Sequence, residues 1–313
     1  MRKILSKLAI FFMAAIFLVS FSFAKIKIIV VTHGSADDPF WSIVKNGVQQ
    51  AGKDYRRADK LQVLYRAPTT FNMVEMARLI DQAVAERPDG LVVSIPDANA
   101  LGPSIRNAVK SGIPVISINS GSDVFTKLGV TAHVGQTEYE AGLGGGRRMK
   151  ASGAKKALIV NHEVGNVALD LRADGFIKGF GNGEVIGVSK DPNEIKSAVS
   201  AKFRRDNKLD AVLALGPLSG EPTYDAIKEL DKIKDVKVAT FDLSSKMLEA
   251  AAKGEVVFLI DQQPYLQGYL PISMLVQYKR YDTLAPGIVQ TGPGFVTPKN
   301  AAKVIGLAKK GYR

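Results

Sequence analysis

Several short apolar runs in this chain end in polar side chains that can form hydrogen bonds but are weak nucleophiles. Asn119 follows VISI, Asp242 follows VATF, Gln262 follows VFLID, and the pair Asn161-His162 follows LIV. Carboxylate oxygens accept hydroxyl protons, and amides both donate and accept hydrogen bonds. If these run ends converge on one cleft, the groups suit a neutral ligand that carries many hydroxyl groups.

An aromatic pair lies beside a carboxylate in the stretch THGSADDPFW, residues 32–41. Phe40 and Trp41, the only tryptophan, closely follow Asp38. Aromatic faces cover C–H surfaces, so the pair adds to the same chemistry. Taken singly, a polar residue at such a junction is equally well explained as a helix cap or turn, and Trp41 shares its helical phase with core positions. The interpretation therefore depends on the whole set.

The sequence lacks the usual signals for nucleotide binding. A dinucleotide site needs a glycine-rich turn after the first strand, whereas the turn here, THGSADDPF, has one glycine and two acids. The run GLGGG at residues 142–146 follows a helix start, TEYE. Close helix packing therefore explains those glycines better than phosphate binding does.

The usual arrangements for metal binding and nucleophilic catalysis are also missing. His162-Glu163 is half of a zinc-protease motif, but Asn166 stands where the second histidine is needed. There is no cysteine, the three histidines are scattered, and the sequence contains no G-x-S-x-G turn. We therefore expect no metal, no cofactor and no enzymatic activity.

The elements that must position these groups are short Val- and Ile-rich runs alternating with amphipathic helical patterns. Most runs are apolar on both faces, which is typical of buried parallel strands. Alternation of strand and helix predicts right-handed crossovers and doubly wound sheets. The predicted strands are residues 26–31, 62–65, 90–94, 115–118, 157–160, 185–188, 211–214, 238–241 and 256–260.

These strands are too many for one comfortable sheet. We expect an α/β fold of two Rossmann-like doubly wound lobes joined by a three-strand hinge, with ligands bound beyond the carboxyl ends of the strands. The predicted crossings are residues 131–136, 261–264 and 290–293. The predicted N-terminal lobe is residues 25–132 plus 263–291, and the predicted C-terminal lobe is residues 133–262 plus 292–313.

Residues 1–24 have the pattern of a secretory signal peptide. Arg2, Lys3 and Lys7 give a positive start, an apolar run follows, and SFA at residues 22–24 is a small-x-small cleavage site. An uncleaved N-terminal anchor is the alternative. Because no cysteine follows the signal peptide, lipid attachment to that residue is excluded, and we expect a monomer free in the periplasm.

The formal net charge of the whole chain is +12, but its cations are spread in isolated pairs. That spread is typical of solvated helix ends rather than of a nucleic-acid-binding stripe. Export also removes nucleic acid from the expected partners.

Six segments, taken in order, resemble the type I periplasmic sugar-binding proteins, the ribose-binding-protein-like family that serves ABC importers. They are DDPFW at 37–41, PDGLVVSIPDA at 88–98, SGIPVISINS at 111–120, LRADGF at 171–176, VATFDLS at 238–244 and LIDQQPYLQGY at 259–269. The resemblance covers nearly the whole mature chain. It implies a protein that captures a monosaccharide or polyol between two lobes and delivers it to an ABC transporter permease.

The resemblance also implies roles for individual residues. Arg172 matches an arginine whose planar fork points two N–H donors at ring and hydroxyl oxygens. Asp242 matches a carboxylate that accepts sugar hydroxyls, and Gln262 matches a polar residue at the hinge. The aromatic pair is expected to stack on the sugar ring. The implied ligand-binding residues are Asp38, Phe40, Trp41, Asn119, Arg172, Asp242 and Gln262.

The sequence departs from the ribose type at several of these positions. Ser120 stands where an arginine is expected, and Gly216-Pro217 replaces an Asn-Asp pair. The loop at residues 32–38 is also longer than usual. Ribose itself is therefore not implied, and another monosaccharide, a sugar alcohol or a deoxy sugar fits equally well. The secondary candidates for ligand binding are His33, Ser120, His162 and Pro217.

Three other functions fit part of the pattern. An exported sugar-active α/β enzyme needs paired carboxylates at a defined separation, for which Asp38 and Asp242 are the candidates. A ligand sensor would present its closed form to a chemoreceptor or sensor kinase. A transcription regulator would need a DNA-binding helical module at the N-terminus, where the predicted signal peptide lies.

Overall fold

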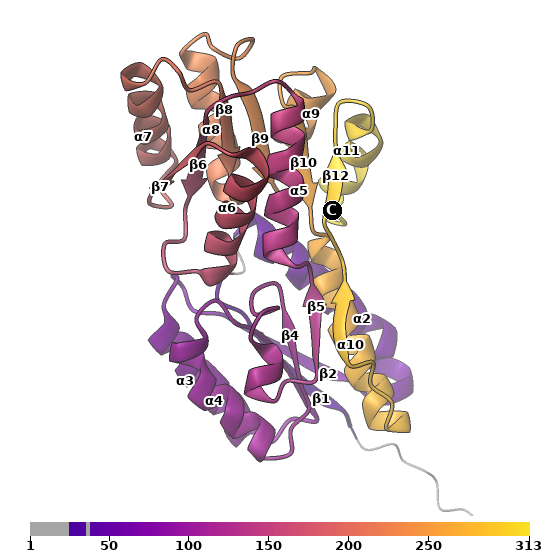
Figure 1. The fold of residues 1–313 in the computed structure, drawn as a ribbon. Helices are drawn as coiled ribbons and strands as arrows, with labels where there is room; N and C mark the ends of the chain where they lie inside the picture. The colour runs from indigo at the N-terminus through magenta and orange to yellow at the C-terminus, as the bar shows by residue number, and fades with distance from the viewer. Residues whose placement is uncertain (1–24, 36–37) are drawn as a thin grey trace, which may run out of the picture.

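The computed structural model describes residues 25–35 and 38–313, so the predicted signal peptide lies outside the described residues. Figure 1 shows two lobes, the C-terminal lobe above the N-terminal one, each a β-sheet covered by helices. The two-lobe α/β fold predicted from the sequence is confirmed.

The N-terminal sheet is entirely parallel. Its order is β11 (Gly287–Gln290), β5 (Ala132–Gly135), β4 (Val115–Ile118), β3 (Gly90–Ser94), β1 (Lys27–Val31) and β2 (Gln62–Arg66). Alternate strand residues face opposite layers of helices because side chains alternate along a strand. Ile28 and Val30 pack toward α2 (Pro39–Asp59) and α10 (Pro264–Tyr281), whereas Ile29 packs toward α3 (Met73–Ala85) and α4 (Ala98–Lys110).

The C-terminal sheet repeats this plan, except that its edge strand β12 runs antiparallel to β10. Its order is β12 (Gly294–Val296), β10 (Phe258–Asp261), β9 (Lys237–Phe241), β8 (Ala211–Ala214), β6 (Ala157–Asn161) and β7 (Gly183–Gly187). Helices α5 (Glu138–Ala151) and α6 (Val167–Phe180) cover one face. The other face is covered by α7 (Pro192–Arg205), α8 (Pro217–Glu229), α9 (Ser245–Ala252) and α11 (Ala301–Lys309).

Three strands, β5, β11 and β12, were not predicted as strands. Their sequences, AHVG, GIVQ and GFV, are too short and too polar for an apolar run to stand out, and pairing with neighbours far along the chain makes them strands. The bounds of six predicted strands also differ, four of them (β1, β2, β6 and β9) by one residue at one end and two by more. The structure has β7 at Gly183–Gly187 instead of 185–188, and β10 at Phe258–Asp261 instead of 256–260.

The chain passes between the lobes at three places. It crosses after β5, after β10 and between β11 and β12 (Figure 1). Buried side chains tie the crossings together: the Thr291 hydroxyl donates to the Gln262 carbonyl at 2.7 Å, and Gln263 Nε2 donates to the Thr291 carbonyl at 2.6 Å. Hydrogen bonds therefore link two adjacent crossings.

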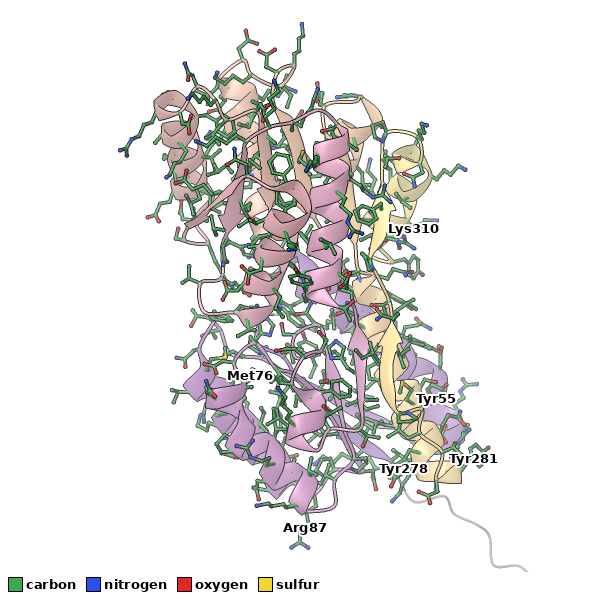
Figure 2. All side chains as sticks on the ribbon, viewed as in Figure 1. Tyr55, Met76, Arg87, Tyr278, Tyr281 and Lys310 are labelled. Carbon is green, nitrogen blue, oxygen red and sulfur yellow. The ribbon has the colours of Figure 1, made fainter. Side chains whose placement is uncertain are left out.

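The glycine-rich run of α5 packs backbone to backbone against α6. A Cβ added at Gly142 would lie 2.1 Å from the Arg172 carbonyl oxygen, and one at Gly146 would lie 2.2 Å from the Phe176 carbonyl oxygen. This confirms the helix-packing interpretation of the run. Elsewhere, side chains fill the layers between helices and sheets, whereas exposed residues such as Arg87 point away from the lobes (Figure 2).

Candidate ligand-binding cleft

A small cavity lies between the lobes, lined by residues of both. Most of its side chains are buried, so the structure is a closed form. The residues that line it are His33, Asp38, Phe40, Trp41, Asn119, His162, Glu163, Asn166, Leu169, Arg172, Gly216, Pro217, Asp242 and Gln262.

The start of α2 supplies the aromatic wall. Asp38 caps this helix, because its Oδ1 accepts the N–H groups of Phe40 at 2.9 Å and Trp41 at 3.4 Å. The Trp41 ring meets the rings of Phe40 and His33 edge-on, with centroids 5.0 and 4.7 Å apart. Both aromatics line the cavity and also belong to the N-terminal core, so one helical phase serves both purposes.

Asn119 and Asp242 occupy equivalent places in the two lobes, one residue after β4 and one after β9. Both have left-handed backbones, with φ of 59° and 65°, a conformation that Asn and Asp tolerate better than most residues. Gln262 joins them: Asn119 Nδ2 donates to Gln262 Oε1 at 3.1 Å, and Gln262 Nε2 donates to Asp242 Oδ1 at 2.9 Å. One hinge amide therefore connects the strand ends of both lobes.

Burial raises the pKa of Asp242 to about 7, although Arg172 and the bond from Gln262 oppose the shift. Burial also raises the pKa of Asp38, and the charge of Glu163 adds to that shift. The cavity therefore holds carboxyl groups that lack the solvation they would have in water. A ligand hydroxyl that donates to them would replace that lost solvation.

Arg172 lines the cavity, but three of its N–H donors already form hydrogen bonds within the protein. Its Nε donates to Glu138 Oε2 at 2.6 Å, its Nη2 to Glu138 Oε1 at 3.1 Å, and its Nη1 to the Leu215 carbonyl at 2.8 Å. The expectation that two of its N–H donors point at the ligand therefore stays a prediction, and the donors on the Glu138 side are not among them. Only the N–H groups left over from these bonds can reach a ligand, while Glu138 holds the pKa of Arg172 above its usual value against the effect of burial.

His162 fills space that Gly216 leaves open. A Cβ at Gly216 would lie 2.5 Å from the imidazole, whose Nδ1 is 3.2 Å from the Ser219 hydroxyl. Burial lowers the pKa of His162 to about 4, so the ring is neutral at pH 7 and offers one donor and one acceptor.

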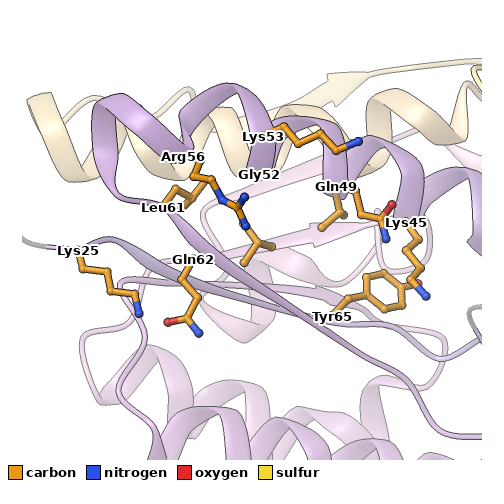
Figure 3. A pocket seen from close by; sticks show the side chains of 11 residues that line it. Lys25, Lys45, Gln49, Gly52, Lys53, Arg56, Leu61, Gln62 and Tyr65 are labelled. Atoms are coloured by element: carbon orange, nitrogen blue, oxygen red, sulfur yellow. The ribbon is translucent and has the colours of Figure 1, made fainter.

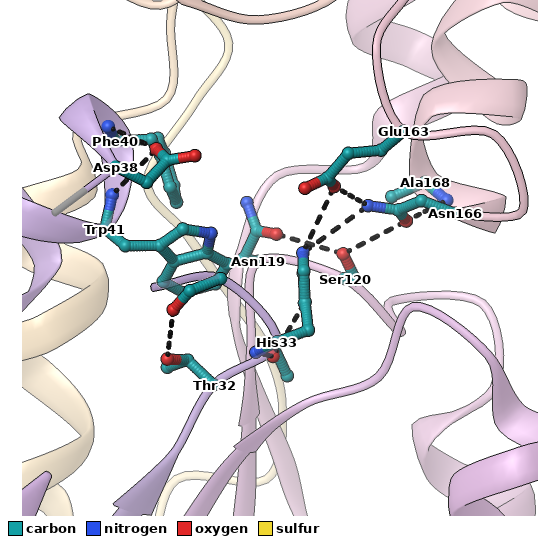
Figure 4. Close-up of polar contacts among 12 residues, drawn as sticks. Thr32, His33, Asp38, Phe40, Trp41, Asn119, Ser120, Glu163, Asn166 and Ala168 are labelled. Atoms are coloured by element: carbon teal, nitrogen blue, oxygen red, sulfur yellow. Dashed lines mark hydrogen bonds and ion pairs between the residues drawn. The ribbon is translucent and has the colours of Figure 1, made fainter. Parts of the chain in front are cut away.

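The segment that follows β6 brings an acidic group to the opposite rim of the cavity. Glu163 Oε1 accepts from Lys190 at 2.6 Å, and its Oε2 accepts from Asn166 Nδ2 at 2.8 Å and lies 3.6 Å from His33 Nε2. Figure 4 shows Glu163 and Asn166 on one side and the aromatic pair on the other.

The structure brings together all seven primary candidates, namely Asp38, Phe40, Trp41, Asn119, Arg172, Asp242 and Gln262, and three secondary ones, His33, His162 and Pro217. Ser120 is not among the lining residues, since its hydroxyl donates to Asn119 at 3.0 Å and lies 3.5 Å from Asn166 Oδ1. Sequence reasoning missed Glu163, Asn166, Leu169 and Glu138. Glu163 and Asn166 closely follow a predicted strand, and that position is the signal by which the sequence could have identified them.

A second hollow lies on the flank of the N-terminal lobe, between α2 and β2. Figure 3 shows its open, basic lining, which includes Lys25, Lys45, Lys53 and Arg56. It shares no residue with the cleft, and its long flexible cations are unlike the buried, mutually bonded groups of a preorganised sugar site.

Residues 25–35 and 38–313 lack two further kinds of feature. This part of the chain holds no cluster of three or more His, Asp or Glu side chains suited to a metal ion. Nor does any described helix have the length and apolar character needed to cross a membrane.

These features, two hinged α/β lobes around a closed polar and aromatic cavity, define a solute-binding protein. A family profile described as "Periplasmic binding protein domain" matches residues 28–282. The chain belongs to this family, as the resemblance implied. A curated relative, the xylose/arabinose-binding protein XylF of Sulfolobus acidocaldarius, is 25% identical over 296 residues, which cover 88% of this chain and 71% of the relative.

Solved structures agree with this assignment. A carbohydrate transporter from Acidothermus cellulolyticus, in complex with myo-inositol, is 32% identical, with a TM-score of 0.86 and coverage of 93% of this chain and 100% of its own. A periplasmic sugar-binding protein of an ABC sugar transporter from Legionella pneumophila is 28% identical, with a TM-score of 0.76 and coverage of 85% and 99%.

Proposed function

We propose that this protein captures a neutral monosaccharide or cyclic polyol in the cleft and delivers it to an ABC importer. The observation that carries the proposal is the closed cavity itself. Carboxylates, amides and two histidines, contributed by both lobes, line it beside two aromatic rings. Ring hydroxyls supply donors for the carboxylates, and ring C–H groups match the aromatic faces.

The charge of the cavity favours a neutral ligand. Its lining includes three carboxyl groups, Asp38, Glu163 and Asp242, and one guanidinium, Arg172. Lys190 and Glu138, which pair with lining residues, add one charge of each sign. An anionic sugar would bring another negative charge into this poorly solvated site. The inositol and pentose ligands named for two relatives are neutral.

A sensor and an enzyme are the two alternatives, and each predicts a different fate of the sugar. Family membership favours binding without turnover. An enzyme would consume the bound sugar, whereas a binding protein returns it unchanged after denaturation. A sensor would pass its signal to a receptor and leave sugar uptake by the cell intact when the gene is deleted.

Calorimetry against inositols, pentoses and hexoses tests the proposal. Asp38→Asn keeps the capping oxygen of α2 but removes the charge, so it should weaken binding with little loss of stability. Asp191→Asn is the matched control, because Asp191 caps α7 with bonds of 2.8 and 3.0 Å and is exposed. Failure of every neutral sugar and polyol to bind, or equal affinity in both variants, would contradict the proposal.

Export to the periplasm belongs to the same proposal. Removal of residues 1–24 should release a soluble chain beginning near Lys25. Mass spectrometry of the periplasmic fraction measures this directly, and recovery of an intact N-terminus only with membranes would argue against it.

A further inference from the structure

His33 of the N-terminal lobe and Glu163 of the C-terminal lobe meet across the cleft, and each is held by hydrogen bonds within its own lobe. In the N-terminal lobe, Ser94 Oγ accepts the backbone N–H of His33 at 2.9 Å and lies 2.8 Å from its ring Nδ1. The serine hydroxyl can donate to Nδ1, and in that tautomer Nε2, which faces the other lobe, carries the ring proton.

The C-terminal half is equally well supported. Glu163 accepts from Lys190 and from Asn166, and Asn166 also caps α6 through the N–H of Ala168 at 3.0 Å. The backbone N–H of Glu163 donates to Asn161 at 2.9 Å. All these bonds lie within one lobe, so opening the cleft leaves them in place.

Closure adds the contacts between the halves. His33 Nε2 comes to 3.6 Å from Glu163 Oε2, and the Val167 N–H donates to the Pro96 carbonyl at 3.1 Å. Lys190 also lies over the ring of Phe71, 5.6 Å from its centroid. The carboxylate is 5% exposed, and although burial alone would raise its pKa, the contact with His33 and the charge of Lys190 hold that pKa well below the usual range.

We propose that Glu163 is a positioning residue for closure: held by Lys190 and Asn166, it draws His33 of the opposite lobe onto the rim of the cavity. The proposal deepens the proposed function, because a ligand that binds the closed form benefits from any contact that populates that form. Preorganisation within each lobe means that closure orders few additional side chains.

The distance between spin labels on the two lobes reports how far the cleft is closed, and it can be measured without any ligand. The chain has no cysteine, so Val74→Cys and Val185→Cys, two exposed positions in opposite lobes, take spin labels uniquely. Glu163→Gln should shift the ligand-free distance distribution toward longer separations. Glu229→Gln, which removes a carboxylate paired with Lys196 at 2.7 Å in an exposed position, should leave it unchanged. Equal distributions in both variants would overturn the proposal.

A double-mutant cycle then separates closure from direct ligand contact. Glu163→Gln and His33→Gln should each raise the Kd for myo-inositol, or for D-xylose if inositol does not bind, on the order of five- to tenfold. The double variant should be little worse than either single one, because both remove the same contact. Independent, multiplying effects would show that Glu163 acts on the ligand alone and would refute the positioning role.

The distance experiment and the affinity experiment can fail independently of each other. If no sugar or polyol binds, the proposed function is wrong, whereas the spin-label distances still report on the contact across the cleft. Circular dichroism checks that each variant is folded, and His33→Gln repeats the distance test from the other lobe.

Discussion

Arg172 and Glu138 form a two-bond ion pair within the C-terminal lobe, with donor–acceptor distances of 2.6 and 3.1 Å and side chains only 3% and 1% exposed. The pair joins the start of α5 to the second turn of α6, where the glycines of α5 let the helix backbones touch. A residue expected to bind ligand is thereby held in place before any ligand arrives.

Glu138→Gln should destabilise the protein strongly, because it leaves the buried Arg172 without its counter-charge. The expected loss is about 3 kcal/mol in the free energy of unfolding, measured by urea denaturation. Glu249→Gln is the control, since Glu249 pairs with Lys309 where both are largely exposed, and its loss should stay below about 1 kcal/mol. Equal effects would mean that burial of the pair is unimportant.

Gly142→Ala should disrupt the contact between α5 and α6. The new Cβ would meet the Arg172 carbonyl oxygen at 2.1 Å, so the helices must separate, and both stability and sugar affinity should fall. Gly52→Ala in α2 places its Cβ at an ordinary 3.6 Å from Val63 and should instead raise stability by about 0.5–1 kcal/mol. Thermal unfolding compares the two, and a stabilised Gly142→Ala variant would count against close packing.

The stability of Asp242→Asn relative to the wild type should depend on pH. Burial raises the folded-state pKa of Asp242 from 3.8 to about 7, so the folded state binds an extra proton between these values. Wild-type stability therefore falls as pH rises through this window. The variant lacks this loss, and its stability relative to wild type should increase by about 1–3 kcal/mol between pH 5 and pH 8.

Denaturation at both pH values measures that difference, while calorimetry should show weaker sugar binding at either pH. Asp97→Asn, at a half-buried cap of α4, is the control, and its stability difference from the wild type should be the same at both pH values. The same constancy in Asp242→Asn would show that Asp242 does not carry a raised pKa.

The charge of the ligand should strongly affect its affinity for the cleft. D-glucuronate should bind at least tenfold more weakly than D-glucose, because its carboxylate would join three acidic side chains in a cavity with one lining guanidinium. Asp38→Asn should reduce the ratio of the D-glucose affinity to the D-glucuronate affinity, because it removes one of those acidic side chains. Calorimetry at pH 7.5 gives both affinities, and equal binding of acid and neutral sugar would contradict this electrostatic picture.

The sequence by itself determined the architecture and the general place of the site. Apolar runs such as those before Asn119 and Asp242 predict buried parallel strands, and parallel strands present their carboxyl ends at one edge. Local pattern therefore predicted the α/β lobes and several polar residues that line the cleft, namely Asn119, His162, Asp242 and Gln262. The glycine run of α5 was also correctly interpreted, because small residues on a helix permit close approach.

Only the tertiary structure decided which of these groups act on one another. Glu138 meets Arg172 from 34 residues away, and Glu163 reaches His33 across the cleft. Neither pairing has a local pattern, because each depends on how helices pack and how far the lobes close. The strands β5, β11 and β12 were missed for the same reason: their backbones gain a partner only after distant segments have folded beside them.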